Sequence, residues 1–532
     1  LELQPGNIIL SATLADGQVK TFGVTNGALI ETADSTAIAE RKVVRVRLDA
    51  FAEQCQITPL ALYVKGNIVS GSKEMPYVGN GVWQGEVALD DMSNQDFNSK
   101  YFYFLFNNNE QLAVKRVKGS RTTMAMPAEG FSTENIRINQ GTYTLKLDML
   151  RYTWDVDAPI NEFRISAFGS SVCNGQGASN NHGYAYQYGQ LLQSRYNSKR
   201  TENLFKVVGT SIGGNTTKNL LDRYDEVIHD FGKYVIIGLS MGNEGIHGAS
   251  NQQAVYDQFR TNMLNIINKL KADGKVPVVM NNYTRSDYNE SDYTYIKKIN
   301  TDIHTWAVPS VNTLGAIDDG AGHWAEGYIA DAYHPNDAGH KEFFYAIPPS
   351  LFDALHEGKA APRRSLTGTM QLRNGSTLSF KGENTVHPFT VTLRIKGTDV
   401  GNLLQFYSGA KRGTLSIEEG GFVKYISTTG AILQSEKALV TSTTASYNVT
   451  LTHYWAQKRT LVYVNKTLVG ELSEQITPTL FIVGDSSKDL ARIYSELSFW
   501  RSALTLEEIT AHQNSKILKS SLDIYAPLKE EM

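Results

Sequence analysis

Residues 234–239 read Tyr-Val-Ile-Ile-Gly-Leu, and residues 240–244 read Ser-Met-Gly-Asn-Glu. An apolar run of this length with polar residues directly after it predicts a strand buried inside a parallel sheet. On both sides of this run, strand-like segments alternate with segments of helical periodicity, which predicts βαβ units and a parallel sheet covered by helices. The strand segments are 163–168, 206–208 and 276–280, and the helical segments are 183–196, 220–231 and 255–270.

The α/β pattern extends from about residue 163 to 357, which is a comfortable size for one domain. We therefore predict a central α/β domain at 161–360. Before it, residues 1–160 contain short β-prone runs bounded by turn signals, such as 101–106 and 143–147. This pattern predicts an N-terminal β-sandwich that serves as an accessory domain.

After the central domain, residues 357–364 have no periodicity and are interpreted as a linker. Residues 365–532 again show apolar and polar residues in alternation, as in 389–395. The pair Asn465-Lys466 lies between two β-prone flanks and predicts a hairpin. These features predict a second β-sandwich at the C-terminal side.

The composition excludes several classes of protein. Among 532 residues there are 51 Lys and Arg and 54 Asp and Glu, so the net charge of −3 argues against a nucleic-acid binder. No apolar run approaches the roughly 20 residues of a membrane span. The two cysteines, Cys55 and Cys173, cannot build a disulfide framework or a four-thiolate zinc site. We expect neither a nucleic-acid partner nor a membrane span.

Two features bear on where the protein works. The chain begins at Leu1 without a visible signal peptide, which is compatible with an export signal that has been removed. The sequon Asn215-Thr216-Thr217 lies in a polar loop where a glycan would obstruct a ligand, so a bacterial source is expected. The protein is therefore expected to be secreted, periplasmic or at the cell surface.

Four polar segments of the central region are candidates for chemistry, because ligands of open α/β sheets bind at the carboxyl ends of the strands. Each segment alone is equally typical of a turn or a helix cap. Together they supply a serine, a histidine with an aspartate, and donors for an oxyanion, which nucleophilic catalysis requires. A metal site is disfavoured, since no cysteine cluster or His-Glu-x-x-His pattern accompanies them. The segments are 168–175 (Phe-Gly-Ser-Ser-Val-Cys-Asn-Gly), 211–216 (Ser-Ile-Gly-Gly-Asn-Thr), 240–245 (Ser-Met-Gly-Asn-Glu-Gly) and 331–337 (Asp-Ala-Tyr-His-Pro-Asn-Asp).

This set of segments resembles the SGNH or GDSL hydrolases, a superfamily of serine esterases on a flavodoxin-like α/β/α sandwich. The resemblance implies that Ser171 is the nucleophile, His334 the base and Asp331 the partner of the base. It further implies an oxyanion hole made of the Ser171 N–H, the Gly214 N–H and the Asn243 amide. A catalytic site of this kind uses no metal and no organic cofactor.

Three positions depart from the superfamily pattern. Ser170 stands where the Asp of the Gly-Asp-Ser motif is usual, Met241 where a glycine is usual, and Glu244 where an Asp is usual. None of these residues is the catalytic base, so the departures leave the chemistry in place. They bear on the geometry of the site and on the substrate.

Three further residues of the central domain are candidates for contact with substrate. Asn281 and Arg285 follow a predicted strand, and His323 lies just upstream of the Asp-His turn. Trp83 and Trp154 of the N-terminal region could stack on sugar rings, although a role in the core is the usual one for a tryptophan.

The C-terminal region resembles a concanavalin A-like jelly roll of the laminin-G type, on the segments 389–395, 459–470 and 498–509. The resemblance implies possible glycan binding by this domain, although many such domains are spacers. The N-terminal region only loosely resembles accessory β-domains of secreted glycan-processing proteins.

The leading hypothesis is a serine esterase that removes acyl groups, acetyl in particular, from a carbohydrate, so the expected partner is a small-molecule or polysaccharide ester. The ester chemistry follows from the four segments, whereas the carbohydrate follows only from the flanking domains. A lipase or thioesterase for lipid-like acyl groups is a second interpretation. A catalytically silent glycan-binding protein is a third.

Overall fold

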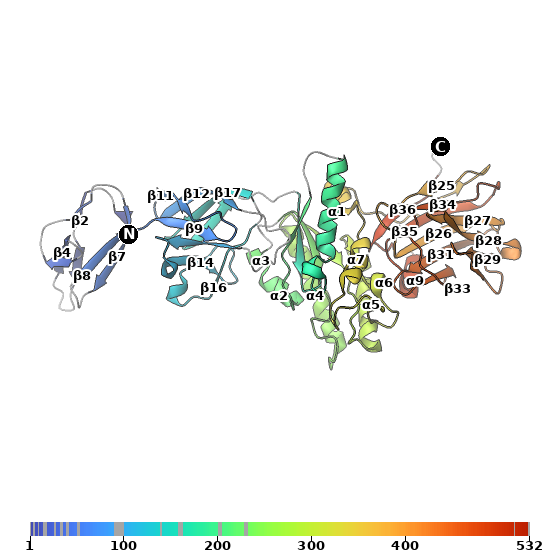
Figure 1. The fold of residues 1–532 in the computed structure, drawn as a ribbon, viewed down its shortest axis with the longest axis horizontal. Helices are drawn as coiled ribbons and strands as arrows, with labels where there is room; N and C mark the ends of the chain where they lie inside the picture. Colours follow the sequence, from blue (N-terminus) through green and yellow to red (C-terminus); the bar gives the residue numbers. More distant parts are fainter. Residues whose placement is uncertain are drawn as a thin grey trace. The chain divides into compact units, whose positions relative to one another are not determined.

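The computed structural model describes residues 2–3, 6–8, 10–13, 19–25, 28–31, 36–38, 42–49, 54–89, 101–138, 141–157, 163–199, 205–227, 232–514 and 517–529. The chain divides into two compact units. The first unit comprises residues 1–161 with 222–231, and the second comprises 162–221 with 232–532. Figure 1 shows that the helices gather in the middle of the sequence, with strands before and after them.

The first unit is built mainly from antiparallel strands, as predicted for residues 1–160. One sheet contains β1 (Glu2–Leu3), β7 (Lys42–Asp49), β8 (Gln54–Pro59), β5 (Ala28–Glu31), β4 (Val19–Thr25) and β3 (Leu10–Thr13), in that order, and β2 (Gly6–Ile8) pairs with β6 (Thr36–Ile38).

Residues 62–157 form two further sheets. Buried aromatic and aliphatic side chains fill the space under them, and Trp154 is a core residue whose indole N–H donates to the Arg121 carbonyl at 2.8 Å. One sheet runs β10 (Lys73–Met75), β9 (Leu62–Gly66), β13 (Phe102–Phe106), β14 (Ala113–Val117), β15 (Met124–Ala125), with β16 (Thr133–Glu134) on β14; the other runs β11 (Tyr77–Gly79), β12 (Val82–Leu89), β17 (Gly141–Asp148), β18 (Thr153–Asp157).

The central sheet is parallel and has the order β20-β19-β21-β22-β23. Its four longer strands confirm the four predicted ones, and every residue of the third is buried, as in a strand covered on both faces. In this order the chain changes sides after its second strand, so the carboxyl ends of β19 and β21 flank a topological switch point, where such sheets bind ligands. The strands are β19 (Arg164–Gly169), β20 (Lys206–Gly209), β21 (Tyr234–Gly238), β22 (Val276–Met280) and β23 (Ser310–Val311).

Helices alternate with these strands. The predicted helix at 255–270 is α4, in which the apolar residues from Phe259 and Met263 to Ile266, Ile267 and Leu270 are buried, whereas Val255 at its start is partly buried. The predicted helical segment at 220–231 is instead divided into α2 and α3, and its last residues lie outside the described part of the chain. The helices are α1 (Tyr184–Lys199), α2 (Thr217–Asp222), α3 (Tyr224–Val227), α4 (Gln252–Ala272), α5 (Glu290–Thr305), α6 (Leu314–Ile317), α7 (Asp337–Tyr345) and α8 (Leu351–His356).

The C-terminal region is formed by two antiparallel sheets that share one hydrophobic core, in which Leu393 of one sheet and Phe406 of the other both take part. The predicted hairpin at Asn465 is confirmed. The concanavalin A-like assignment stays a prediction. One sheet runs β24 (Met370–Gln371), β35 (Ile493–Trp500), β26 (Phe389–Lys396), β31 (Ser446–Tyr454), β32 (Arg459–Val464), β33 (Thr467–Ser473), with β36 (Leu522–Ala526) on β35; the other runs β25 (Leu378–Phe380), β34 (Leu480–Val483), β27 (Gly401–Ser408), β28 (Lys411–Ile417), β29 (Val423–Ile426), β30 (Ile432–Gln434).

A buried polar cluster joins the C-terminal region to the central sheet inside the second unit. Glu508, on α9 (Leu506–Gln513), contacts His304 of α5 at 2.7 Å and accepts a hydrogen bond from the Asn312 amide at 2.9 Å. The hydroxyls of Ser310 and Ser520 meet at 2.6 Å beside it. Because these groups are withdrawn from water, each depends on the others for its hydrogen bonds.

This cluster predicts a large stability effect at one position. Glu508→Ala leaves buried groups of His304 and Asn312 without their partner, at a cost of about 3 kcal/mol in the free energy of unfolding. Glu507→Ala is the matched control, because Glu507 pairs with Lys297 at the solvent-exposed edge of the same contact and should cost less than about 1 kcal/mol. Chemical denaturation of the two variants measures the difference, and equal costs would contradict the prediction.

Candidate active site

The candidate nucleophile lies in the turn that follows β19. Of the two adjacent serines, Ser170 is fully buried, whereas Ser171 is 8% exposed and its hydroxyl reaches the histidine of the site. The loop after Ser171 packs closely on the histidine turn. A Cβ added at Gly177 would lie 2.2 Å from the Pro335 carbonyl oxygen, and Gly177 has a φ of +96°, so only glycine is accommodated there.

The histidine and the aspartate lie on a tight turn just before α7. The backbone N–H groups of Ala330 and Asp331 both donate to the His334 carbonyl, at 3.0 and 3.3 Å. The N–H groups of Tyr333 and His334 in turn donate to Asp331 Oδ1, at 2.8 and 3.0 Å. The turn is therefore held from both ends, and it orients the imidazole by its own backbone.

The three side chains form one hydrogen-bonded chain. His334 Nε2 is 3.0 Å from Ser171 Oγ, and His334 Nδ1 is 2.9 and 2.8 Å from the two carboxylate oxygens of Asp331. Partial burial alone would raise the pKa of Asp331, but the bonds from the His334 ring and the two backbone N–H groups outweigh it and lower that pKa. Asp331 therefore stays ionised at neutral pH and can accept from Nδ1–H.

Free backbone donors lie beside the serine. Within the described residues, neither the Ser171 N–H nor the Gly214 N–H donates a hydrogen bond to another group. The glycine loop is close to the serine, since a Cβ added at Gly213 would lie 3.8 Å from Ser171 Cβ. The Asn243 amide donates to the Asn215 carbonyl at 3.1 Å, which ties the third segment to the second. The structure thus brings the predicted donor loops together.

The loop that carries Asn243 is supported from two sides. The Asn282 side chain accepts from the Met241 N–H at 2.6 Å, and Glu244 accepts from the Thr217 N–H at 2.5 Å. Burial raises the pKa of Glu244, although the bonds from Thr217 act in the opposite direction. Glu244 therefore serves as an acceptor at the start of α2, beside the glycine loop.

Arg285 lies at the edge of the site, between two of its loops. Its Nη1 would be 2.4 Å from a Cβ added at Gly242, and its guanidinium lies over the Tyr333 ring at 4.3 Å from the ring centroid. Asp287 holds the guanidinium through two bonds, at 3.0 and 2.9 Å. Tyr333 itself is 50% exposed and packs edge-on against the His334 ring.

Two other predicted contacts, Asn281 and His323, make hydrogen bonds to groups outside the catalytic trio. Asn281 is fully buried, and its side chain accepts from the Ser520 hydroxyl at 3.2 Å, so it belongs to the packing against the C-terminal region. The two ring nitrogens of His323 contact Asp319 at 3.2 Å and the Tyr288 carbonyl at 2.8 Å. His323 therefore links the loop that contains Asp319 to the loop that contains Tyr288.

Three residues near the site were not singled out from the sequence. Asn282, one position after Asn281, supports the loop of Asn243, and only the tertiary structure distinguishes the two neighbours. Tyr333 could have been noticed as an aromatic residue inside a polar turn. His340 of α7 is buried, contacts the Gln176 carbonyl at 2.9 Å and thereby holds the serine loop.

No group of three or more His, Cys, Asp or Glu side chains that could hold a metal ion occurs in the part of the chain that the structure describes. Within the same residues, no helix is both long enough and apolar enough to cross a membrane.

The comparisons with known proteins agree with the geometry in the central region. Residues 167–342, about a third of the chain, match the model of the GDSL-like Lipase/Acylhydrolase family. The chain therefore carries a domain of this family, which is a hydrolase domain that acts on esters. No curated protein matches the chain.

Several solved structures resemble part of the chain. Axe2, an acetylxylan esterase from Geobacillus stearothermophilus, is 18% identical, and the match covers 39% of this chain and 100% of that one with a TM-score of 0.28. A SAP-like pentraxin from Limulus polyphemus is 14% identical, and the match covers 31% of this chain and 90% of the pentraxin with a TM-score of 0.23. The CBM40 of a Ruminococcus gnavus IT-sialidase is 15% identical, and the match covers 27% of this chain and 96% of the CBM40 with a TM-score of 0.22.

His340, which holds the serine loop, is expected to make the stability of the protein sensitive to acid. Burial lowers the pKa of His340 to about 4, although its contact with the Gln176 carbonyl acts in the opposite direction. In the unfolded chain a histidine titrates near 6.5, so the unfolded state binds the proton first and stability is lost as the pH falls from about 6.5 to 4. The loss attributable to His340 is about 3 kcal/mol.

In the variant His340→Gln the side-chain amide can still donate to the Gln176 carbonyl, but it does not titrate. The loss of stability between pH 7 and pH 4 should therefore be smaller than in the parent. Part of the loss should remain in the variant, because burial also lowers the pKa of His453, to about 3. Urea unfolding of the parent and the variant across this pH range measures the change. An unaltered pH dependence in the variant would contradict this account.

Proposed function

We propose that the chain is a serine esterase that hydrolyses O-acyl esters, acetyl esters in particular, carried by carbohydrate. The observation that carries the proposal is the chain of hydrogen bonds from Asp331 through His334 to Ser171, with His334 Nε2 at 3.0 Å from Ser171 Oγ. A glycan-binding protein without activity would have no need of this alignment, which makes a silent role the weaker interpretation.

In the proposed acylation step, Ser171 Oγ attacks the ester carbonyl carbon while His334 Nε2 takes the hydroxyl proton. Asp331, ionised and bonded to Nδ1–H, holds the imidazole in the tautomer that has a free lone pair on Nε2. Negative charge develops on the carbonyl oxygen, where the N–H groups of Ser171 and Gly214 and the Asn243 amide can donate. His334 then gives its proton to the departing alcohol oxygen.

In the proposed deacylation step, water attacks the acyl group on Ser171 with His334 again as the base. The same oxyanion donors act on the second tetrahedral intermediate, and the carboxylic acid leaves as Ser171 recovers its proton. Every group in these two steps is a side chain or backbone N–H of this chain, so the mechanism calls for no metal or organic cofactor.

One feature supports the carbohydrate part of the proposal. Tyr333 presents a half-exposed ring beside His334, backed by the Arg285 guanidinium, and sugar rings commonly rest on such aromatic surfaces. We propose that Tyr333 contacts the sugar that carries the ester.

We further propose a division into domains at 1–160, 161–360 and 365–532, with glycan binding by the C-terminal domain. A secreted, periplasmic or cell-surface location would suit a substrate of this kind.

The nucleophile is tested by a pair of neighbouring variants. Ser171→Ala should lower kcat for p-nitrophenyl acetate by at least about 10³-fold, because no other group can form the covalent intermediate. Ser170→Ala is the matched control: it removes the hydroxyl one position earlier, and activity should stay within about tenfold of the parent. Equal rates for the parent and Ser171→Ala would overturn the assignment. In the same assay, kcat/KM that rises from acetyl to longer acyl esters would favour a lipase.

The role of Tyr333 is tested by substrates with and without a sugar. Tyr333→Ala should raise KM for an acetylated xylo-oligosaccharide by about fivefold, corresponding to about 1 kcal/mol of lost stacking, and leave hydrolysis of ethyl acetate unchanged. Tyr333→Phe keeps the ring and should behave as the parent. A loss of equal size on both substrates would show that Tyr333 supports His334 rather than the sugar.

A further inference from the structure

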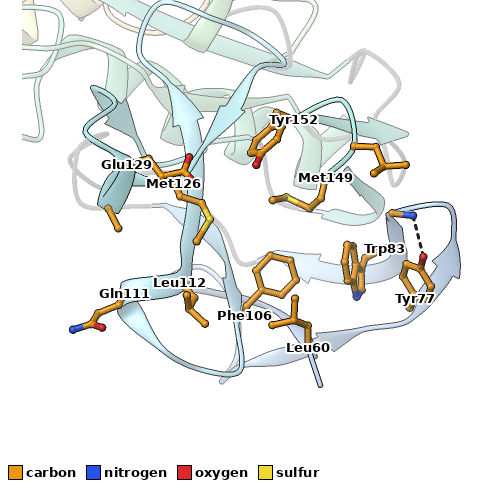
Figure 2. A pocket seen from close by; sticks show the side chains of 13 residues that line it. Leu60, Tyr77, Trp83, Phe106, Gln111, Leu112, Met126, Glu129, Met149 and Tyr152 are labelled. Carbon is orange, nitrogen blue, oxygen red and sulfur yellow. Dashed lines mark hydrogen bonds between the residues drawn. The ribbon is translucent and has the colours of Figure 1, made fainter. Parts of the chain in front are cut away.

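The first unit contains a pocket of about 520 Å³ that none of the preceding functions uses. It opens between the two sheets of residues 62–157, where strand ends and turns of both sheets meet, and Figure 2 shows the side chains around it. This volume falls within the range of small-molecule sites in proteins. The lining residues are Leu60, Tyr77, Gly81, Trp83, Phe106, Gln111, Leu112, Met126, Ala128, Glu129, Met149, Leu150 and Tyr152.

Aromatic rings packed against one another make up one wall of the pocket. The Trp83 ring lies 4.9 Å from the Tyr77 ring and 5.2 Å from the Phe106 ring, tilted or edge-on in each case. In Figure 2 the Phe106 ring, the side chains of Met126 and Met149, and the Tyr152 hydroxyl surround the same open space. Because the rings are locked by mutual packing, this wall is formed before any ligand arrives.

The turn between β17 and β18 forms the opposite rim, and its composition is unusual. Asp148 Oδ1 accepts the N–H groups of Leu150 and Arg151, both at 3.0 Å, and this framework holds the turn. Turns of this kind usually carry Gly, Asn or Asp. Here Leu150 is 73% exposed and Tyr152 is 41% exposed, so apolar side chains are held in solvent beside the pocket.

Tyr152 is also held in a strained backbone conformation. Its φ is +52°, which is the left-handed region that bulky side chains rarely adopt. Its carbonyl accepts the Met124 N–H at 2.7 Å, and this bond to the other sheet maintains the conformation. An exposed and strained aromatic residue contributes little to folding, so its place at the rim indicates a role in binding.

The polar groups that line the pocket indicate the chemical class of its ligand. The Tyr152 hydroxyl and the side chains of Gln111 and Glu129 make no hydrogen bond to another described residue. None of the lining residues is Lys, Arg or His, so an anionic ligand would find no countercharge there. A carboxylate and a tyrosine hydroxyl beside aromatic faces suit a neutral molecule that has hydroxyl groups around an apolar ring face.

We propose that this pocket binds a neutral sugar residue of a glycan chain. The apolar face of the sugar ring packs against the aromatic wall, and its hydroxyls bond to Glu129 and to the Tyr152 hydroxyl, which faces the open space in Figure 2. The proposal is independent of the esterase, since it concerns only residues of the first unit.

The test uses the full chain and isothermal titration with xylohexaose and cellohexaose, which carry no ester. At least one of them should bind with a Kd below about 1 mM. Because the C-terminal domain and Tyr333 are proposed to contact sugars as well, the number of binding sites is compared: Tyr152→Asn should remove one site or weaken it at least tenfold. It should nevertheless raise the melting temperature by about 2 °C, because Asn adopts the left-handed conformation more readily than Tyr. Glu129→Gln should weaken binding without a change in melting temperature.

Phe131→Ala is the matched control, because Phe131 is 54% exposed in the same unit but does not line the pocket, and both readouts should stay at the parent values. The same number of sites with the same affinities in Tyr152→Asn as in the parent would place all glycan binding elsewhere and overturn the proposal. Absence of binding up to about 5 mM of both oligosaccharides would overturn it too. So would binding of laurate in place of either sugar, or a lowered melting temperature of Tyr152→Asn, since Tyr152 would then be a packing residue.

Discussion

The hydrogen bond between Ser171 Oγ and His334 Nε2 joins residues 163 positions apart, and most of the second unit serves to bring these two atoms within 3.0 Å. Ser171 follows the first strand of the parallel sheet, whereas His334 lies on a turn beyond the last strand. The parallel arrangement brings both to one edge, because carboxyl ends of parallel strands always share an edge. A polar contact that is largely withdrawn from water tolerates little displacement, so the serine loop and the histidine turn must be held in fixed positions relative to each other.

Local hydrogen bonds provide this register. Backbone N–H groups bind Asp331 and so orient the histidine turn, while His340 of the following helix reaches back to the Gln176 carbonyl of the serine loop. The loop of Asn243 is held by Asn282, which lies just after the neighbouring strand β22. The site is therefore supported mainly by neutral hydrogen bonds between loops, and a buried neutral histidine makes part of this support dependent on pH.

The C-terminal region is bound to the central sheet more tightly than a tethered module would be. Glu508 enters a buried polar cluster with His304 and Asn312, and Asn281, which the sequence suggests as a substrate contact, faces Ser520 in the same area. The strand β23 is only two residues long and lies next to this cluster. The C-terminal region thus completes the packing of the last strand of the sheet.

The sequence by itself predicted the alternation of strands and helices and the parallel sheet, because buried strands are apolar runs. It also singled out Ser171, Asp331 and His334 as candidates, because polar residues after such strands stand out and their segments resemble those of the SGNH or GDSL hydrolases. It could not separate Asn281 from Asn282, since neighbours differ only in the direction of their side chains once the chain is folded. It could not foresee that Glu508, more than 200 residues from His304, would pair with it, because such a contact depends on how distant segments pack. The pocket beside Tyr152 likewise exists only where the ends of two sheets meet, so only the tertiary structure decided it.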